Sequence, residues 1–156
     1  MSLGSGAPPT ADLTLQHMTL GRAFEFEATI SLEDVDRFAA LTGDFSPLHM
    51  DDAFARARGF RGRVVHGAFT AGLVSRLIGT QAPGRNCLLH SIGMQFIAPV
   101  YPGDRLRIEA VVDQVSEAVE SVTLKVHVWD VAESRLVAKA KVTMGFTQSK
   151  HAEPAF

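Results

Sequence analysis

The chain has 156 residues, of which 46% are hydrophobic and 21% charged, and a formal net charge of -2. This length and composition predict a single globular domain with a substantial core, and exclude a disordered chain or a disulfide-stapled mini-protein. The near-neutral charge disfavours nucleic acid and acidic membrane surfaces as partners. Cys87 is the only cysteine, so the chain has no intrachain disulfide and no zinc site built on several thiolates. We therefore expect a reducing, cytoplasmic location.

The chain ends differ in composition from the rest of the chain. Residues 1–20 begin with a Gly-, Ser- and Pro-rich stretch that lacks the features of a secretory signal. We expect residues 1–20 to be a flexible lead-in, residues 21–148 to form the domain, and residues 149–156 to be a tail.

The first half of the domain is predicted to be mainly helical after one strand over residues 24–30. Ser31 and Asp34 form a capping-box-like helix start, and Gly43 is the expected end of that helix. A loop over residues 44–49 follows. Asp51 is then placed to cap a short helix over residues 52–58, which Gly59 ends.

A third helix, over residues 68–79, is apolar on almost every side. Only Thr70, Ser75 and Arg76 interrupt it. Such a helix in a soluble protein has to be enclosed by other structure. It is also too short, and too interrupted by Arg76, to cross a membrane.

The second half of the chain supplies the enclosing strands. Apolar and polar residues alternate over residues 105–112, 121–129 and 136–146, and a further strand is expected over residues 87–100. Such alternation is typical of antiparallel strands with one face on the core. The sequence therefore predicts an α+β domain in which a curved antiparallel sheet wraps one long buried helix.

A carboxylate and an imidazole flank a stiff loop at Asp44–His49. Pro47 restricts its own φ and the conformation of Ser46 before it. Rigid placement is what an acid–base pair requires, so Asp44 and His49 are candidate catalytic residues.

The segment Val65-His66-Gly67 leads directly into the apolar helix. The first amides of a helix lack intrahelical partners and carry the positive end of the helix dipole. Gly67 lets a ligand approach this backbone closely, so its amide is a candidate carbonyl-polarising group. His66 is expected to orient the helix start.

These residues resemble a known family. The block Gly43–His49, followed by Val65-His66-Gly67, is similar to the hydratase motif of MaoC-like proteins and R-specific enoyl-CoA hydratases. Residues 96–104 are similar to the family's Pro-rich bend. The resemblance extends from residue 31 to residue 112 and more loosely to residue 146. It implies the single-domain hot-dog fold, a homodimer or higher homo-oligomer, and an acyl-CoA substrate without a metal or redox cofactor.

The resemblance implies roles for individual residues. Asp44 and His49 correspond to the catalytic carboxylate and imidazole, Gly67 to the backbone donor, and Ser75 to a helix serine near the site. Ser46 stands where many members carry Asn. The implied reaction is reversible addition of water to a trans-2-enoyl thioester, giving the R-3-hydroxyacyl product.

Some alternatives remain open at this stage. Arg61 and Arg63, in a cluster with Arg56 and Arg58, could bind the phosphates of coenzyme A or simply be solvated, because Arg matches phosphate geometry. The site itself also suits a hot-dog acyl-CoA thioesterase or a non-catalytic acyl-thioester-binding module. The acyl chain length and the choice between coenzyme A and acyl carrier protein are not predicted.

Overall fold

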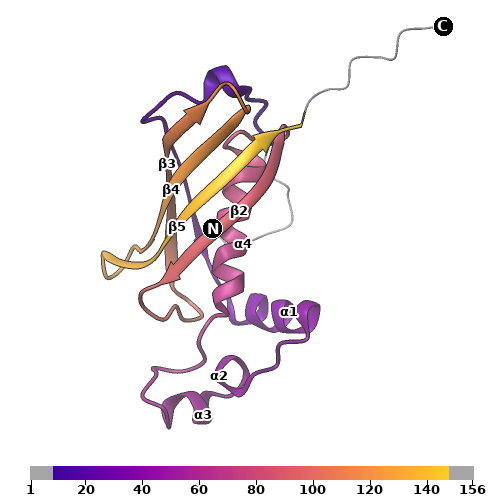
Figure 1. Ribbon diagram of the computed structural model, residues 1–156. Helices are drawn as coiled ribbons and strands as arrows, with labels where there is room; N and C mark the ends of the chain where they lie inside the picture. Colours follow the sequence, from indigo (N-terminus) through magenta and orange to yellow (C-terminus); the bar gives the residue numbers. More distant parts are fainter. Residues whose placement is uncertain (1–8, 148–156) are drawn as a thin grey trace, which may run out of the picture.

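The computed structural model describes residues 9–147 and shows one helix packed on one face of a five-stranded sheet, with three short helices gathered at one end (Figure 1). The elements in chain order are η1 (Leu15–His17), β1 (Ala23–Thr29), α1 (Leu32–Thr42), α2 (Pro47–Met50), α3 (Asp52–Arg56), α4 (Gly67–Thr80), β2 (Cys87–Phe96), β3 (Arg105–Ser116), β4 (Ser121–Asp130) and β5 (Arg135–Phe146). No helix among these residues is long and apolar enough to span a membrane.

The sheet is antiparallel throughout, with strand order β1-β3-β4-β5-β2. β3, β4 and β5 form consecutive hairpins, whereas β2 lies at the far edge from β1. The sheet curves without closing into a barrel. The predicted α+β hot-dog domain is thereby confirmed for the described residues.

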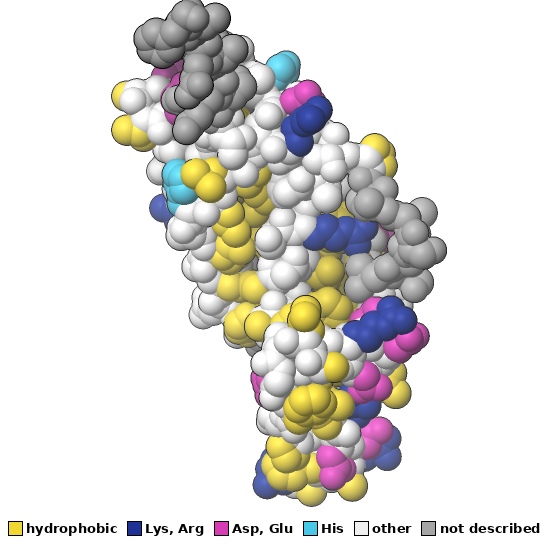
Figure 2. Space-filling view, turned by 90° about the vertical axis from the view of Figure 1, so that its right-hand side faces the viewer, with side chains coloured by type: hydrophobic (Ala, Val, Ile, Leu, Met, Phe, Trp, Pro, Cys, Tyr) yellow, Lys and Arg dark blue, Asp and Glu magenta, His cyan; other side chains and the backbone are white. Residues whose placement is uncertain are grey.

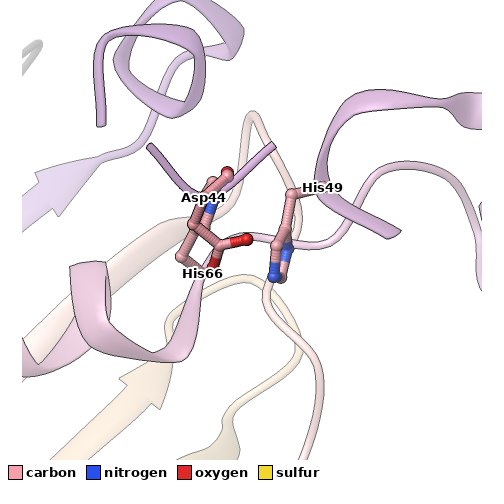
Figure 3. A group of neighbouring side chains, drawn as sticks. All are labelled: Asp44, His49 and His66. Carbon is pink, nitrogen blue, oxygen red and sulfur yellow. Dashed lines mark hydrogen bonds between the residues drawn. The ribbon is translucent and has the colours of Figure 1, made fainter. Parts of the chain in front are cut away.

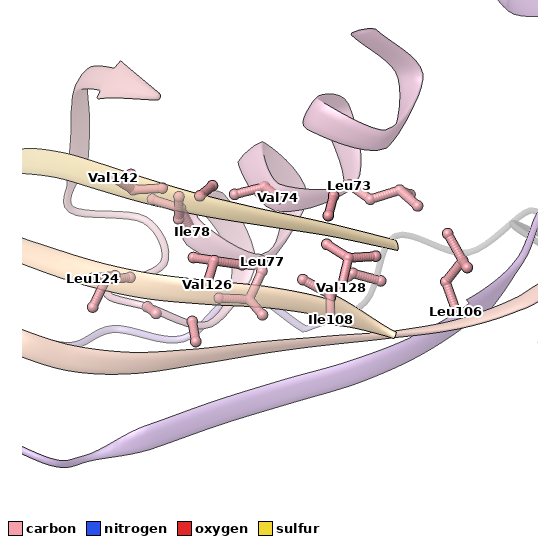
Figure 4. Close-up of a cluster of buried hydrophobic side chains, with 14 of the residues drawn as sticks. Leu73, Val74, Leu77, Ile78, Leu106, Ile108, Leu124, Val126, Val128 and Val142 are labelled. Atoms are coloured by element: carbon pink, nitrogen blue, oxygen red, sulfur yellow. The ribbon is translucent and has the colours of Figure 1, made fainter. Parts of the chain in front are cut away.

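The core lies between α4 and the concave face of the sheet (Figure 4). Alternate residues of β3, β4 and β5 point into it, as the sequence pattern predicted, and α4 contributes Leu73, Val74, Leu77 and Ile78. The fully or almost fully buried strand residues include Leu106, Ile108, Leu124, Val126, Val128 and Val142. Each buried aliphatic side chain of this size contributes about 1.5–3 kcal/mol of transfer free energy, so this layer is the main source of stability.

One face of α4 is open, so the prediction that the helix is enclosed on all sides was wrong for the single chain. Ala68, Gly72, Ser75 and Gly79 recur at helical spacing and are exposed. These small residues leave a shallow face beside the edge strand β2. Among the described residues, the five-stranded open sheet covers only one side of the helix.

The helix boundaries follow the capping residues. Ser31 Oγ accepts a hydrogen bond from the Asp34 amide at 3.1 Å, and the Asp34 carboxylate accepts one from the Ser31 amide at 2.9 Å. Gly43 ends α1 in the left-handed region with φ of 77°. Asp51 caps α3 by accepting from the Phe54 amide at 3.0 Å.

The segment expected to be a loop at residues 44–49 contains one short helix, α2. Pro47 is its first residue. Proline suits this position because its φ is already helical and the amide it lacks would have no partner there.

Three predicted boundaries were wrong. β2 ends at Phe96 rather than residue 100, because the chain leaves the sheet before Pro99, and a bulge near residue 90 leaves Leu88 exposed instead of on the core face. α3 ends at Arg56 rather than residue 58. β3 continues to Ser116 rather than ending at residue 112.

The expected flexible lead-in of residues 1–20 is also corrected where the structure describes it. Met18 is completely buried, and Asp12 forms an isolated β-bridge with Gly84. Leu13 and Leu15 pack against the core, because the end of the sheet leaves apolar surface that this segment covers. Residues 1–8 and the predicted tail 149–156 lie outside the described residues.

Candidate active site

The candidate catalytic residues meet where α1, α2 and the start of α4 converge. Gly43 ends α1, Asp44 follows immediately, and His49 lies on α2, while His66 precedes α4. Asp44, His49 and His66 each offer a polar atom within 4.8 Å of the others. Figure 3 shows the Asp44 carboxylate turned towards the His49 imidazole. The predicted pair is therefore brought together.

The backbone around Asp44 is held by local hydrogen bonds. Asp44 Oδ1 accepts from the Ser46 amide at 3.2 Å, and the Asp44 amide donates to Thr42 Oγ1 at 3.3 Å. Such an Asx turn, followed by Pro47, limits the rotation of the carboxylate. Ser46 thus contributes through its amide, and its side chain makes no capping bond.

Hydrogen bonding assigns the proton positions on His49. Its Nδ1 lies 2.7 Å from the carbonyl oxygen of Val64. A carbonyl only accepts, so Nδ1 carries the proton and donates it. In the neutral ring Nε2 is then the unprotonated nitrogen, free to accept a hydrogen bond from a bound molecule.

His66 is buried and links the two halves of the site. Its Nε2 donates to the backbone carbonyl of Asp44 at 2.9 Å, and its ring stacks on that of His49 with centroids 3.9 Å apart and 28° between the planes. Phe38 packs against its other side at 5.0 Å. Within the described residues, Nδ1 of this 2% exposed side chain has no hydrogen-bond partner. His66 therefore contacts both candidate catalytic residues, whereas the sequence predicted only that it orients the start of the helix.

The same three side chains are spaced as metal ligands can be, but the ring orientations do not favour a metal. An imidazole lone pair lies in the plane of its ring. Two rings stacked at 3.9 Å with nearly parallel planes cannot aim both lone pairs at one ion.

A cavity of about 360 Å³ opens beside His49. Its polar lining consists of His49, Thr70 and the backbone of Gly67. The rest of its lining is apolar: Phe60, Val64, Val65, Phe96, Ile97, Ala98, Pro99, Val100, Val137 and Ala138. An apolar cavity with a few converging polar groups is the usual form of a small-molecule site.

Gly67 begins α4 at the wall of this cavity. The amides of Phe69 and Thr70 both donate to the His66 carbonyl, and no backbone bond is made by the amide of Gly67 among the described residues. A Cβ at this position would lie 2.9 Å from the Phe96 ring. A larger residue here would displace the Phe96 ring, and the glycine leaves an amide of the helix N-terminus able to polarise a bound carbonyl.

Thr70 is a site residue that the sequence reasoning missed. It is 2% exposed, lines the cavity, and its hydroxyl makes no hydrogen bond to any other described residue. Its position, three residues after Gly67 and so on the same side of the helix, is a signal that was available. Phe96 and Phe60 were also missed, because only the tertiary fold brings them to the cavity.

Ser75, the helix serine implied by the resemblance, lies away from the cavity. It is on the exposed face of α4, two turns beyond Gly67. In the single chain it does not line the cavity with His49 and Thr70.

Arg61 and Arg63 are both engaged by acidic side chains. Arg61 Nη2 lies 2.5 Å from Asp104, and this hydrogen bond raises the pKa of the Arg61 guanidinium further above its usual value. Arg63 pairs with Asp36, and its Nε donates to the backbone carbonyl of His49 at 2.5 Å. These contacts do not favour the predicted phosphate binding. They make Arg63 a support for the catalytic loop.

The comparisons with known proteins define the family. The MaoC like domain matches residues 16–134. The chain is 32% identical over 117 residues to the (R)-specific enoyl-CoA hydratase of Aeromonas caviae, covering 75% of this chain and 87% of that protein. It is 34% identical over 108 residues to the 3-hydroxybutyryl-CoA dehydratase of Methylorubrum extorquens, covering 69% of each.

A solved structure agrees with these relatives. The structure of the (R)-hydratase from A. caviae involved in PHA biosynthesis superposes with a TM-score of 0.80 and 30% identity, covering 85% of this chain and 99% of that one. The arrangement of helix and sheet is thus that of a hot-dog domain. The protein belongs to the MaoC-like domain family.

Proposed function

We propose that this protein is an R-specific enoyl-CoA hydratase, a hydro-lyase that adds water reversibly to a trans-2-enoyl-CoA and gives the R-3-hydroxyacyl-CoA. The observation that carries the proposal is that His49, which lies beside Asp44, and the start of α4 at Gly67 both line one apolar cavity. The names of the two relatives support the reaction, and the name of the A. caviae relative also supports its R stereochemistry.

The first step is placement of the substrate. The acyl chain lies in the apolar cavity, and the thioester oxygen accepts a hydrogen bond from the Gly67 amide. As water adds, negative charge grows on this oxygen, and the helix N-terminus stabilises it. The reaction therefore needs neither a metal nor a redox cofactor.

The second step uses the Asp44–His49 pair. A water molecule donates one hydrogen bond to the Asp44 carboxylate and the other to His49 Nε2, so its lone pair faces the β-carbon. Asp44 removes a proton as the C–O bond forms, and the pair returns that proton to the α-carbon. Protons balance, and both residues regain their initial state.

A spectrophotometric assay tests the reaction. Crotonyl-CoA should lose its enoyl absorbance without release of free thiol, and chiral analysis should give the R-3-hydroxy product. Free thiol would instead identify a thioesterase. Thioester binding without turnover would identify a non-catalytic binding module.

We also propose a homodimer. The small-residue face of α4 is exposed, and edge strand β2 carries the exposed residues Leu88 and Leu89. Figure 2 shows apolar side chains open to solvent on one face of the molecule. Unprotected edge strands and apolar faces of this kind need a cover. A cytoplasmic location remains a prediction from cysteine usage.

A further inference from the structure

Asp44 and His49 lie close together without bonding to each other directly. Each offers a polar atom within 4.8 Å of the other, yet in the described part of the chain their side chains share no hydrogen bond or ion pair. A water molecule lies about 2.8 Å from each group that it bonds, so a separation of this size suits one bridging water. At closer range a carboxylate and an imidazole form a strong hydrogen bond of their own. The separation therefore depends on contacts that hold the two side chains apart.

His66 contacts both residues from outside their loop. Its Nε2 donates to the backbone carbonyl of Asp44 at 2.9 Å, and its ring stacks on His49 with centroids 3.9 Å apart (Figure 3). Within the loop, the amide of Ser46 donates to Asp44 Oδ1, and its carbonyl accepts from the amide of His49. The positions of Asp44 and His49 thus depend on Ser46 along the chain and on His66 across it.

The ring of His66 is itself held by neighbouring aromatic rings. Phe38 of α1 packs against it at 5.0 Å between centroids, and Phe69 of α4 stacks on Phe38 at 5.2 Å with 17° between the planes. Aromatic pairs of this kind contribute to stability beyond the area that they bury. The catalytic loop is thereby connected to two helices through four rings: His49, His66, Phe38 and Phe69.

Hydrogen bonding indicates that the His66 ring is neutral. Nε2 carries the proton that it donates to Asp44, and Nδ1 has no hydrogen-bond partner among residues 9–147. The other buried side-chain nitrogens without a hydrogen bond in that range, Arg107 Nε and Arg135 Nε, each lie within 3.1 Å of a glutamate carboxylate. A proton on Nδ1 would bury a charged donor without an acceptor, which is unfavourable. His66 therefore contacts the acid–base pair without adding charge to it.

His66 does not reach the cavity. It is 2% exposed and is absent from the cavity lining, so it is not placed to contact a bound substrate. Burial of Nδ1 without a partner also destabilises the fold, and a phenylalanine would fill the same space without that cost. Stability alone thus does not account for a histidine here, whereas its two contacts with Asp44 and His49 do.

We propose that His66 is a positioning residue that keeps the Asp44 carboxylate and the His49 ring one water molecule apart. This inference rests on the proposed function. The Nε2 hydrogen bond fixes the backbone of Asp44, and the stacked ring fixes the plane of the His49 imidazole. Neither side chain then moves into the space of the attacking water. Loss of either contact lets the carboxylate and the imidazole bond directly, and this displaces the water.

Two variants each keep one of the two contacts. His66→Phe keeps a flat ring against His49 and loses the donor to Asp44, whereas His66→Gln keeps an amide donor and loses the stacking. Both should lower kcat for crotonyl-CoA by roughly 10- to 100-fold, because a displacement of about 1 Å at a catalytic group has effects of this size. KM should stay close to wild type, since His66 does not line the cavity. The control His127→Phe makes the same change at an exposed position of β4 and should alter neither constant.

Thermal denaturation separates positioning from a purely structural role. In H66F the loss of one hydrogen bond is offset by removal of the unpartnered Nδ1, so its Tm should stay within about 3 °C of wild type. A fall in kcat of the folded variant at this Tm supports the proposal. A loss of activity that only follows a loss of folded protein would overturn it, and so would wild-type kcat in both variants.

Crystal structures give a readout that does not depend on turnover. In the wild type a water molecule should lie between the Asp44 carboxylate and His49 Nε2, whereas in H66Q these two groups should bond directly at about 2.8 Å. The same separation in both proteins would overturn the positioning role. A wild type that hydrates no thioester would instead refute the proposed function, and the two failures are thus distinguished.

Discussion

At the scale of single residues, backbone carbonyls determine how the two histidines are used. The backbone carbonyl of Val64 accepts a hydrogen bond from His49 Nδ1, and the backbone carbonyl of Asp44 accepts one from His66 Nε2. The proton-accepting nitrogen of His49 is therefore specified without any charged neighbour. In the proposed mechanism His49 and Asp44 have complementary roles, because both accept hydrogen bonds from the attacking water molecule.

Replacement of either catalytic side chain should abolish most activity. Asp44→Asn or His49→Ala is expected to lower kcat by about 100-fold or more, because each removes an acid–base group. Circular dichroism and Tm should remain close to wild type, since Asp44 is exposed and His49 half-buried. Full hydration of crotonyl-CoA by folded D44N protein would contradict the mechanism.

Thr70 should contribute a hydrogen bond to the bound thioester. Its hydroxyl has no described partner and faces the cavity one turn from Gly67. Thr70→Val keeps the shape, so we expect about a three- to tenfold loss in kcat/KM from the lost hydrogen bond and an unchanged Tm. Thr70→Ser should retain activity.

The matched control for this change is Thr123→Val, which alters a buried threonine of β4 away from the cavity. It should leave kcat/KM unaltered. Equal kinetics for T70V and wild type would show that the hydroxyl makes no contact with substrate.

The residues that could be predicted are those whose chemistry is local in the sequence. Asp44, His49 and Gly67 each occur in a short block whose spacing already restricts the backbone. Thr70 was overlooked, although its position three residues after Gly67 places it on the same side of the helix. Phe96 lies 29 residues from Gly67 in the chain, and only the folding of β2 against α4 brings them together.

At the scale of elements, the catalytic loop depends on a contact between α1 and the segment before α4. Arg63 is mostly buried, pairs with Asp36 of α1, and donates to the His49 carbonyl. Arg63, a candidate phosphate ligand in the sequence, thus stabilises the position of α2. Its engagement could not be predicted, because Asp36 is 27 positions away.

Arg63→Lys should weaken this brace, because a lysine cannot make both contacts with one planar group. We expect a loss of about 1–2 kcal/mol in unfolding free energy, or about 3–6 °C in Tm. A fall in kcat of about tenfold should accompany it as His49 loses its position. Thermal denaturation and steady-state kinetics measure both effects.

Arg37→Lys is the control, since Arg37 forms an exposed pair with Glu33 on α1. Exposed salt bridges contribute little to the free energy of unfolding, so the Tm and kcat of R37K should match those of wild type. If R63K behaves like R37K, Arg63 does not support the loop.

The positions of the strands were predicted well, whereas the sequence analysis made no prediction of their order in the sheet. Alternation of apolar residues identified the core faces of β3, β4 and β5, because each strand has one face on α4. The prediction of which β2 residues face the core was less accurate. A bulge shifts its register between Leu89 and Ser91, and alternation alone does not reveal an inserted residue. Which strand becomes the edge depends on long-range pairing.

At the scale of the whole molecule, the single chain leaves part of its central helix uncovered. The sequence predicted an enclosed helix because α4 is apolar on nearly every side. The structure covers it on the sheet side only and leaves Gly72, Ser75 and Gly79 exposed. The proposed dimer accounts for this difference, because a second copy would cover the apolar side of α4 that the sheet leaves exposed.

A charged side chain on this face should separate the proposed dimer. A Cβ added at Gly72 would meet no neighbouring group within 4 Å, so the monomer can accommodate Gly72→Lys. The substitution also replaces a poor helix former with a good one. We expect wild type to sediment as a dimer and G72K to sediment as a folded monomer, because two facing lysines would be buried without partners. Val119 lies on a turn and is 71% exposed. The Val119→Lys variant adds the same charge elsewhere, and it should remain dimeric. A wild type that stays monomeric at high micromolar concentration would contradict the dimer, and a dimeric G72K would place its interface away from the open face of α4.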